Sequence, residues 1–164
     1  MSNESDAKNQ VAAQLDLIKI LLAATKVDYA RLDELKEELA DITYNSRNVA
    51  TWSNSGEYMA LMVLANECTD EAEARQAVYD SPLSVEVRAE WHAQGERNVP
   101  PNEFQILLCT SGPAVRILGE FCDGGVPCDA HLEYSDWGTP CTDYHDRSSE
   151  DTLLEYAAFF FEGF

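Results

Sequence analysis

The spacing of apolar residues changes near Pro82, and this change constrains the fold more than any other feature of the sequence. Before it, apolar residues recur three and four positions apart, as in Leu15, Ile18 and Leu22. That spacing is typical of an amphipathic helix. After it, residues 83–91 alternate apolar and polar side chains, which predicts a strand with one face in water. Helices in one half of a chain and strands in the other predict an α+β fold.

The first half predicts a helical part over residues 10–80, preceded by a flexible arm at residues 1–9. Its second helix is expected at about 28–42, and its pattern is compatible with an antiparallel hairpin with the first helix. Residues 43–55 are polar and predict a loop. A third helix at about 56–68 is rich in Met and Leu, so we expect it to be central.

The second half, residues 81–164, predicts a four- to five-stranded antiparallel sheet closed by a C-terminal helix. Turn residues such as Gly112 and Pro113 separate the strands and indicate hairpins. All of these elements are expected to form a single domain over residues 1–164. The expected strands cover residues 83–91, 104–110, 114–121, 130–134 and, as a fifth, 141–145.

Acidity is the strongest compositional signal. Thirty Asp and Glu residues face eleven Lys and Arg residues, which gives a formal net charge of −19. The acids divide evenly between residues 1–80 and 81–164, so the whole folded surface is expected to be acidic rather than one tail. Such a surface repels nucleic acid and anionic membranes and attracts basic proteins. An equally simple interpretation is that the acidity serves solubility alone.

The sequence predicts a cytoplasmic protein. No apolar stretch approaches the ~18 residues that span a bilayer, and Met1–Gln10 is too polar for a signal peptide. The chain has five cysteines, and an odd number in such a protein argues against a disulfide framework. We therefore expect the cysteines to be reduced.

A local cluster of metal-ligand residue types lies in the second half, but its spacing matches no recognised zinc site. The simpler interpretation is that these are small apolar cysteines and surface histidines, and we expect no metal and no cofactor. A nucleophilic cysteine needs positive neighbours that lower its pKa, and the acidic composition opposes this. The sequence therefore predicts a protein that is not an enzyme. The cluster consists of Cys122, Cys128, His131, Cys141 and His145.

A second candidate site is the segment Ser135–Pro140, where Asp136 and Trp137 lie between turn-forming residues. An exposed Trp is enriched in binding sites, whereas a Trp folded under the loop closes the core. Both interpretations are open at this stage.

Several segments of the second half resemble a family of uncharacterised phage, prophage and plasmid proteins, over roughly residues 80–164. The resemblance implies that the chain belongs to a mobile element, and it implies no particular activity. The segments that carry it are SPLSVEVR at 81–88, EFQILLCTSGPAVRILGE at 103–120, LEYSDWGTP at 132–140 and DTLLEY at 151–156.

Combined with the acidity, this setting favours a non-enzymatic anti-defence protein of the host cytoplasm. It is expected to bind a host protein with a basic, nucleic-acid-binding surface, such as a nuclease or a CRISPR complex, with carboxylates in place of phosphates. One alternative is a phage life-cycle interaction module that uses Asp136 and Trp137; another is an enzyme or metal protein that uses the cysteine–histidine cluster. The candidate surface is one helix face that carries Asp33, Glu34, Glu37, Glu38 and Asp41.

Overall fold

The structure is a computed structural model that describes residues 3–41, 49–110, 112–136, 139–144, 146 and 148–162. Its contacts divide the chain into two compact units. Unit 1 consists of Met1–Lys19 and Val78–Phe164, and unit 2 consists of Ile20–Ala77. Whereas the sequence predicts one domain, an internal segment of the chain thus forms a compact unit of its own.

The predicted α+β class is confirmed, with helices in the first half, a five-stranded antiparallel sheet and a C-terminal helix. None of the helices in the described part of the chain combines the length and the apolar character that a membrane span requires. The helices are α1 (Asn3–Ala24), α2 (Tyr29–Asp41), α3 (Val49–Ala65), α4 (Glu71–Tyr79) and α5 (Glu150–Phe161). The strands are β1 (Ser84–Arg88), β2 (Glu103–Cys109), β3 (Ala114–Cys122), β4 (Val126–Ser135) and β5 (Thr142–Tyr144).

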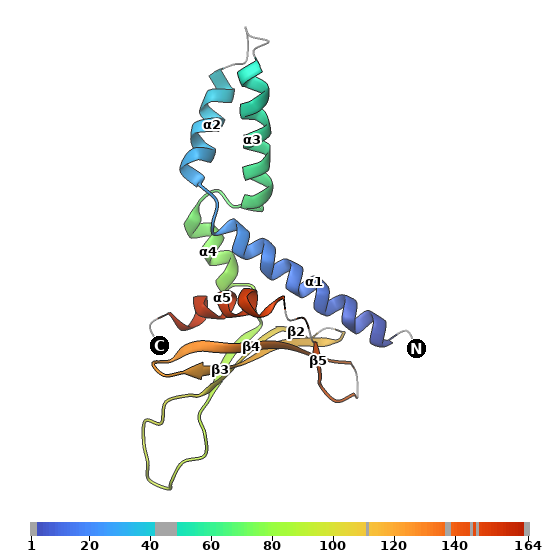
Figure 1. The fold of residues 1–164 in the computed structure, drawn as a ribbon, viewed down its shortest axis with the longest axis vertical. Coiled ribbons are helices and arrows are strands. Elements are labelled where there is room, and N and C mark those ends of the chain that lie inside the picture. The colour runs from blue at the N-terminus through green and yellow to red at the C-terminus, as the bar shows by residue number, and fades with distance from the viewer. Residues whose placement is uncertain are drawn as a thin grey trace. The chain divides into compact units, whose positions relative to one another are not determined.

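The sheet of unit 1 is a simple meander in the order β1-β2-β3-β4-β5. Alternate residues of β2, β3 and β4 are buried, so one face of the sheet forms the core and the other meets solvent. Helix α5 and the first part of α1 cover the buried face (Figure 1). The core residues of the sheet are Phe104, Ile106, Leu108, Val115, Ile117, Ala130, Leu132 and Tyr134.

An aromatic cluster joins the sheet to α5. The Phe104 ring packs against Phe121 and Phe161, with ring centroids 5.2 Å and 5.1 Å away. Phe104 lies opposite Gly119 in the ladder, and the ring rests where the side chain of any larger residue at position 119 would be. Glycine therefore allows the ring and the Asp129 carbonyl oxygen to approach the β3 backbone.

A buried hydrogen-bond chain fixes α5 to the segment that precedes β1. Tyr156 of α5 is fully buried, and its hydroxyl lies 2.6 Å from the Ser81 hydroxyl, which in turn donates to the Val78 carbonyl oxygen at 2.7 Å. Because the Ser81 hydroxyl donates its proton to the Val78 carbonyl oxygen, the Tyr156 hydroxyl must be the donor to Ser81. Burial raises the pKa of Tyr156, so this donor keeps its proton at neutral pH.

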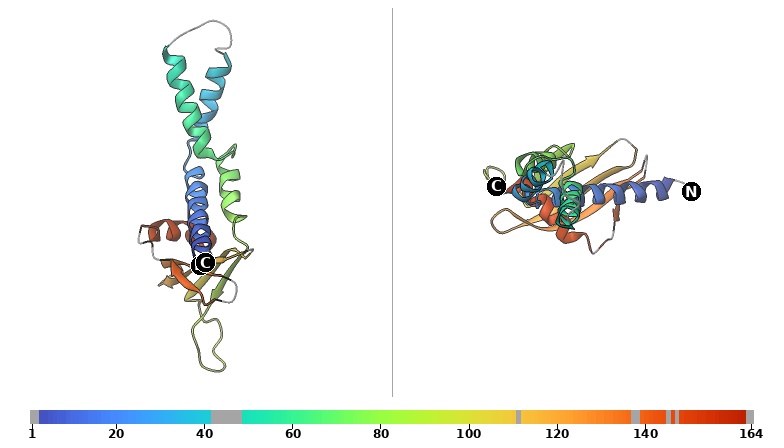
Figure 2. Two further views of the ribbon diagram at one scale, coloured as in Figure 1. Left: turned by 90° about the vertical axis from the view of Figure 1, so that its right-hand side faces the viewer. Right: turned by 90° about the horizontal axis from the view of Figure 1, so that it is seen from above.

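In unit 2, α2 and α3 run side by side as an antiparallel hairpin (Figure 2). The hairpin thus forms between α2 and α3, rather than between the first two helices as the sequence allowed. Helix α3 begins at Val49, so the loop expected over residues 43–55 ends earlier; residues 42–48 lie outside the described part of the chain. The expected central position of α3 was also wrong, since much of its apolar surface is exposed.

The first helix corrects another expectation. Helix α1 begins at Asn3 and buries Ala7, so a helix occupies most of residues 1–9, where the sequence predicts a flexible arm. The polar residues of that segment misled the prediction because they lie on the exposed side of an amphipathic helix, whose buried side continues through Val11 and Leu15.

Replacing Gly119 with Ala should destabilise unit 1. The added methyl group overlaps the Phe104 ring and the Asp129 carbonyl oxygen, and such overpacking typically costs about 1–3 kcal/mol. Urea unfolding followed by circular dichroism measures the change. Gly56→Ala in α3 is the control, because its methyl group meets open space and removing a helix glycine stabilises by about 0.5–1 kcal/mol. Equal effects of the two variants would contradict this account of Gly119.

Candidate functional site

Helix α2 places the predicted carboxylates on its exposed surface. Leu32 and Leu35 are buried and fix the inward side of the helix, while Tyr29 is half-buried. The side chain of Asp41, the last residue of α2, lies outside what the structure describes. The exposed acids of α2 are Asp33, Glu34, Glu37 and Glu38.

One arginine organises part of this acidic surface. Arg31 donates two hydrogen bonds of 3.1 Å to Glu57 of α3, and it also contacts Glu34 at 3.3 Å and Glu38 at 3.6 Å. Asn54 of α3 donates to Glu38 at 2.8 Å. Glu34 and Glu38 therefore help to join α2 to α3, and Arg31 partly neutralises them.

Asp33 and Glu37 carry the charge that Arg31 does not neutralise. They lie four residues apart, about one helical turn, and the helical period places them away from the flank that bears Arg31, Glu34 and Glu38. Solvated carboxylates spaced in this way leave a negative strip on one side of the hairpin. Of the predicted acids, these two are the most available to a partner.

The exposed apolar surface of α3 was not predicted from the sequence. The half-buried Tyr58 and Leu61 and the buried Ala65 mark its inward side, while Met59 and Val63 are 58% and 73% exposed. Helical spacing places Met59 and Val63 opposite the inward side. Methionine adapts to irregular partner surfaces, and exposed apolar patches often mark interfaces. The high Met and Leu content was the available signal, and it was interpreted as evidence for burial.

The second predicted site falls in unit 1. Asp136 follows β4 and forms a turn with Thr139: its backbone N–H donates to the Thr139 hydroxyl at 3.0 Å, and its carbonyl oxygen accepts from the Thr139 N–H at 2.9 Å. Trp137 lies outside the described residues. The Asp136 loop and the acids of α2 belong to different compact units.

The solvent face of the sheet carries a hollow of about 530 Å³, lined by residues of β1 to β4. Arg116 of β3 crosses this face. Its guanidinium donates to Glu133 at 2.7 Å and 2.9 Å, to Gln105 at 2.8 Å and to the Cys141 sulfur at 3.5 Å. These contacts tie β2, β3 and β4 together on the solvent-facing side of the sheet.

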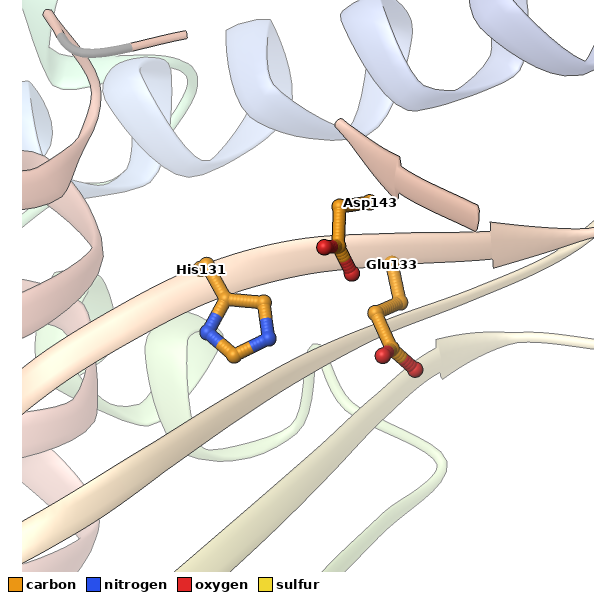
Figure 3. A group of neighbouring side chains, drawn as sticks. All are labelled: His131, Glu133 and Asp143. Atoms are coloured by element: carbon orange, nitrogen blue, oxygen red, sulfur yellow. The ribbon is translucent and has the colours of Figure 1, made fainter. Parts of the chain in front are cut away.

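Glu133 also belongs to a group of possible metal ligands with His131 and Asp143 (Figure 3). One ligand atom from each lies within 4.8 Å of the others. His131 and Asp143 are exposed, and the Arg116 guanidinium already supplies positive charge to Glu133. The ion pair accounts for the arrangement, so the geometry gives no separate reason to place a metal here.

The cysteine prediction needs correction. Cys122 and Cys128 form a disulfide that joins the two strands of the β3–β4 hairpin beside its turn, whereas the sequence predicts reduced cysteines. The odd count misled the prediction, because five cysteines still leave room for pairs. Cys68, Cys109 and Cys141 are free. Thus the disulfide uses two members of the predicted cysteine–histidine cluster, and the fifth member, His145, lies outside the described residues.

A further exposed aromatic residue lies in the loop between β1 and β2, which extends away from the sheet (Figure 1). Strand β1 ends at Arg88, and Trp91 is fully exposed, although the alternation of residues 83–91 predicts that its side chain faces the core. The alternation continues in the sequence for three residues after the strand has ended.

The Arg31–Glu57 contact yields a measurable prediction. Hydrogen bonding from Arg31 lowers the pKa of Glu57, so the pair stabilises the hairpin above the ordinary glutamate pKa, and this contribution is lost as the pH falls through the lowered value. Arg31→Gln should raise the pKa of Glu57, measured by NMR titration of its side-chain carboxyl carbon. Lys36→Gln removes the same charge from α2 and should leave the Glu57 pKa nearly unchanged. Equal shifts in both variants would mean that general charge, not the contact, sets this pKa.

Comparisons of the chain with protein-family models, with curated proteins and with solved structures found no match. The resemblance to phage, prophage and plasmid proteins therefore stays a prediction that depends on the sequence motifs alone.

Proposed function

We propose that the protein is a non-enzymatic interaction protein whose α2–α3 hairpin binds a basic, nucleic-acid-binding surface of a host protein. The observation that supports this most directly is the exposure of Asp33, Glu34, Glu37 and Glu38 on one short helix. From residue 33 to residue 41 the helix rises about 12 Å. Over this length its carboxylates can contact several phosphate-binding side chains of a partner.

The apolar surface of α3 adds a reason to favour a protein partner. Charge alone gives fast but weak and salt-sensitive encounters, whereas buried apolar contacts slow dissociation. Met59 and Val63 belong to the same hairpin as the acids of α2, so one unit offers both kinds of contact. A solubilising acidic surface needs no exposed Met and Val, and their presence therefore favours binding over solubility alone.

The biological setting is part of the same proposal. The sequence motifs suggest a mobile element, and a host nuclease or CRISPR complex is a partner whose basic groove suits a row of carboxylates. The net charge of −19 opposes direct binding to DNA, RNA or anionic membranes. We propose the host cytoplasm as its location because such partners act there, although disulfides such as Cys122–Cys128 are rare in that compartment, and we assign it no cofactor.

Reversing Asp33 and Glu37 together to Lys should abolish capture of the partner. Each solvated carboxylate contributes less than about 1 kcal/mol, so Glu37→Gln alone should have almost no effect. The measurement is capture of host-lysate proteins on the immobilised chain at about 50 mM and 300 mM salt, with bound proteins identified by mass spectrometry. Proteins lost in the variant should be nucleic-acid-binding proteins, released by high salt and by added duplex DNA.

Asp6→Lys with Asp123→Lys is the matched control, because it makes the same change in net charge at two exposed residues of unit 1. It should leave capture intact. If both double variants lose the same proteins, general acidity rather than α2 explains the binding. If neither loses them and Trp137→Ala does, the interaction-module hypothesis for the Asp136 loop replaces this proposal.

A further inference from the structure

Strand β1 forms an open edge of the sheet in unit 1. In the part of the chain that the structure describes, β1 pairs with β2 on one side and with no strand on the other. The free edge of a strand exposes backbone N–H and C=O groups that another strand can pair with. The opposite edge of the sheet is β5, which has only three residues and offers a much shorter ladder.

The side chains of β1 do little to block such pairing. Val85 and Val87 lie on the same face as the core residues opposite them in β2, yet they are 37% and 44% exposed. Leu83, which extends the ladder through its N–H bond to Leu107, is 61% exposed. Natural edge strands are usually protected by charged side chains, especially Lys, by Pro or by a bulge. Ser84–Arg88 contains no Lys and no Pro, and its two charges, Glu86 and Arg88, are opposite in sign. These observations identify β1 as a strand that lacks a neighbour.

The sequence of β1 is complementary to itself. When two copies pair antiparallel with Val87 opposite Val87, each Glu86 lies opposite Arg88 of the second copy, and Val85 lies opposite Ala89. Two cross-strand ion pairs and a central Val–Val pair then form around a two-fold axis. In the register centred on Glu86, two glutamates would lie opposite each other, which is unfavourable.

We propose that β1 binds a second copy of this chain, edge to edge, so that the two sheets form one continuous sheet across a two-fold axis. Arg88 also contacts Glu103 of its own chain, and its side chain remains largely exposed. Its guanidinium has five N–H donors, enough for Glu103 and for Glu86 of the second copy. The inference is independent of the proposed function, because β1 lies in unit 1 and α2 lies in unit 2.

Two single charge reversals test the register. Glu86→Arg places Arg opposite Arg at both pairs, and Arg88→Glu places Glu opposite Glu, so each variant alone should self-associate about tenfold or more weakly than the original chain. Mixed in equal amounts, the two variants restore opposite charges at both pairs and should form a heterodimer. Sedimentation velocity across a range of concentrations measures all three samples. Glu120→Arg on β3, away from the edge, is the control and should leave the dimer intact.

A monomeric original chain overturns the proposal. So do single variants that remain as dimeric as the original, or a mixture that stays monomeric. If either variant fails to fold by circular dichroism, amide hydrogen exchange of the original chain decides instead. Dilution should then expose the β1 amides while leaving those of β3 protected, and β1 protection that does not depend on concentration would refute the dimer.

Discussion

The packing of the Phe104 ring against the backbone of Gly119 in β3 determines how α5 packs on the sheet in unit 1. Because Gly119 has no side chain, the ring lies close to the sheet and meets Phe121 and Phe161 together. Phe161 belongs to α5, so the same contact sets where that helix crosses the sheet. The Tyr156–Ser81 hydrogen bond then holds α5 against the segment that leads into β1. In the described part of the chain, the helices of unit 1 lie on one face of its sheet (Figures 1 and 2).

Much of this fold follows from local sequence patterns. Apolar residues with helical spacing predicted α1, and apolar runs separated by turn residues predicted β2 and β3 to within one or two residues. The exposed carboxylates of α2 were also predictable, because buried Leu32 and Leu35 fix which side of the helix faces inward. Such features depend only on residues close together in the chain. The Arg31–Glu57 contact joins two helices across 26 residues, and no periodicity in either helix indicates it.

The features that could not be predicted depend on partners distant in the sequence. Composition cannot distinguish an apolar helix that is buried from one that is exposed, and α3 was misjudged for that reason. Trp91 continues the alternating pattern of β1, but the pairing of β1 with β2 ends at Arg88. The end of the pairing, rather than the pattern, therefore explains why Trp91 is exposed. The Cys122–Cys128 pair depends on the register of β3 and β4, which brings the two α-carbons within 5.7 Å. In each case a non-local contact determined the outcome.

Whether the Cys122–Cys128 bond is present depends on the redox conditions that the chain has experienced. Disulfides persist in oxidising compartments and are rare where glutathione and thioredoxin keep thiols reduced. The bond closes a ring of only a few residues, so its loss releases little chain entropy and should loosen the turn at Gly124 and Gly125 while the aromatic core stays packed. After alkylation, a chain without the bond carries two more alkyl groups than a chain with it. The mass of the intact protein, taken from cells after alkylation, therefore reports whether the bond is present there.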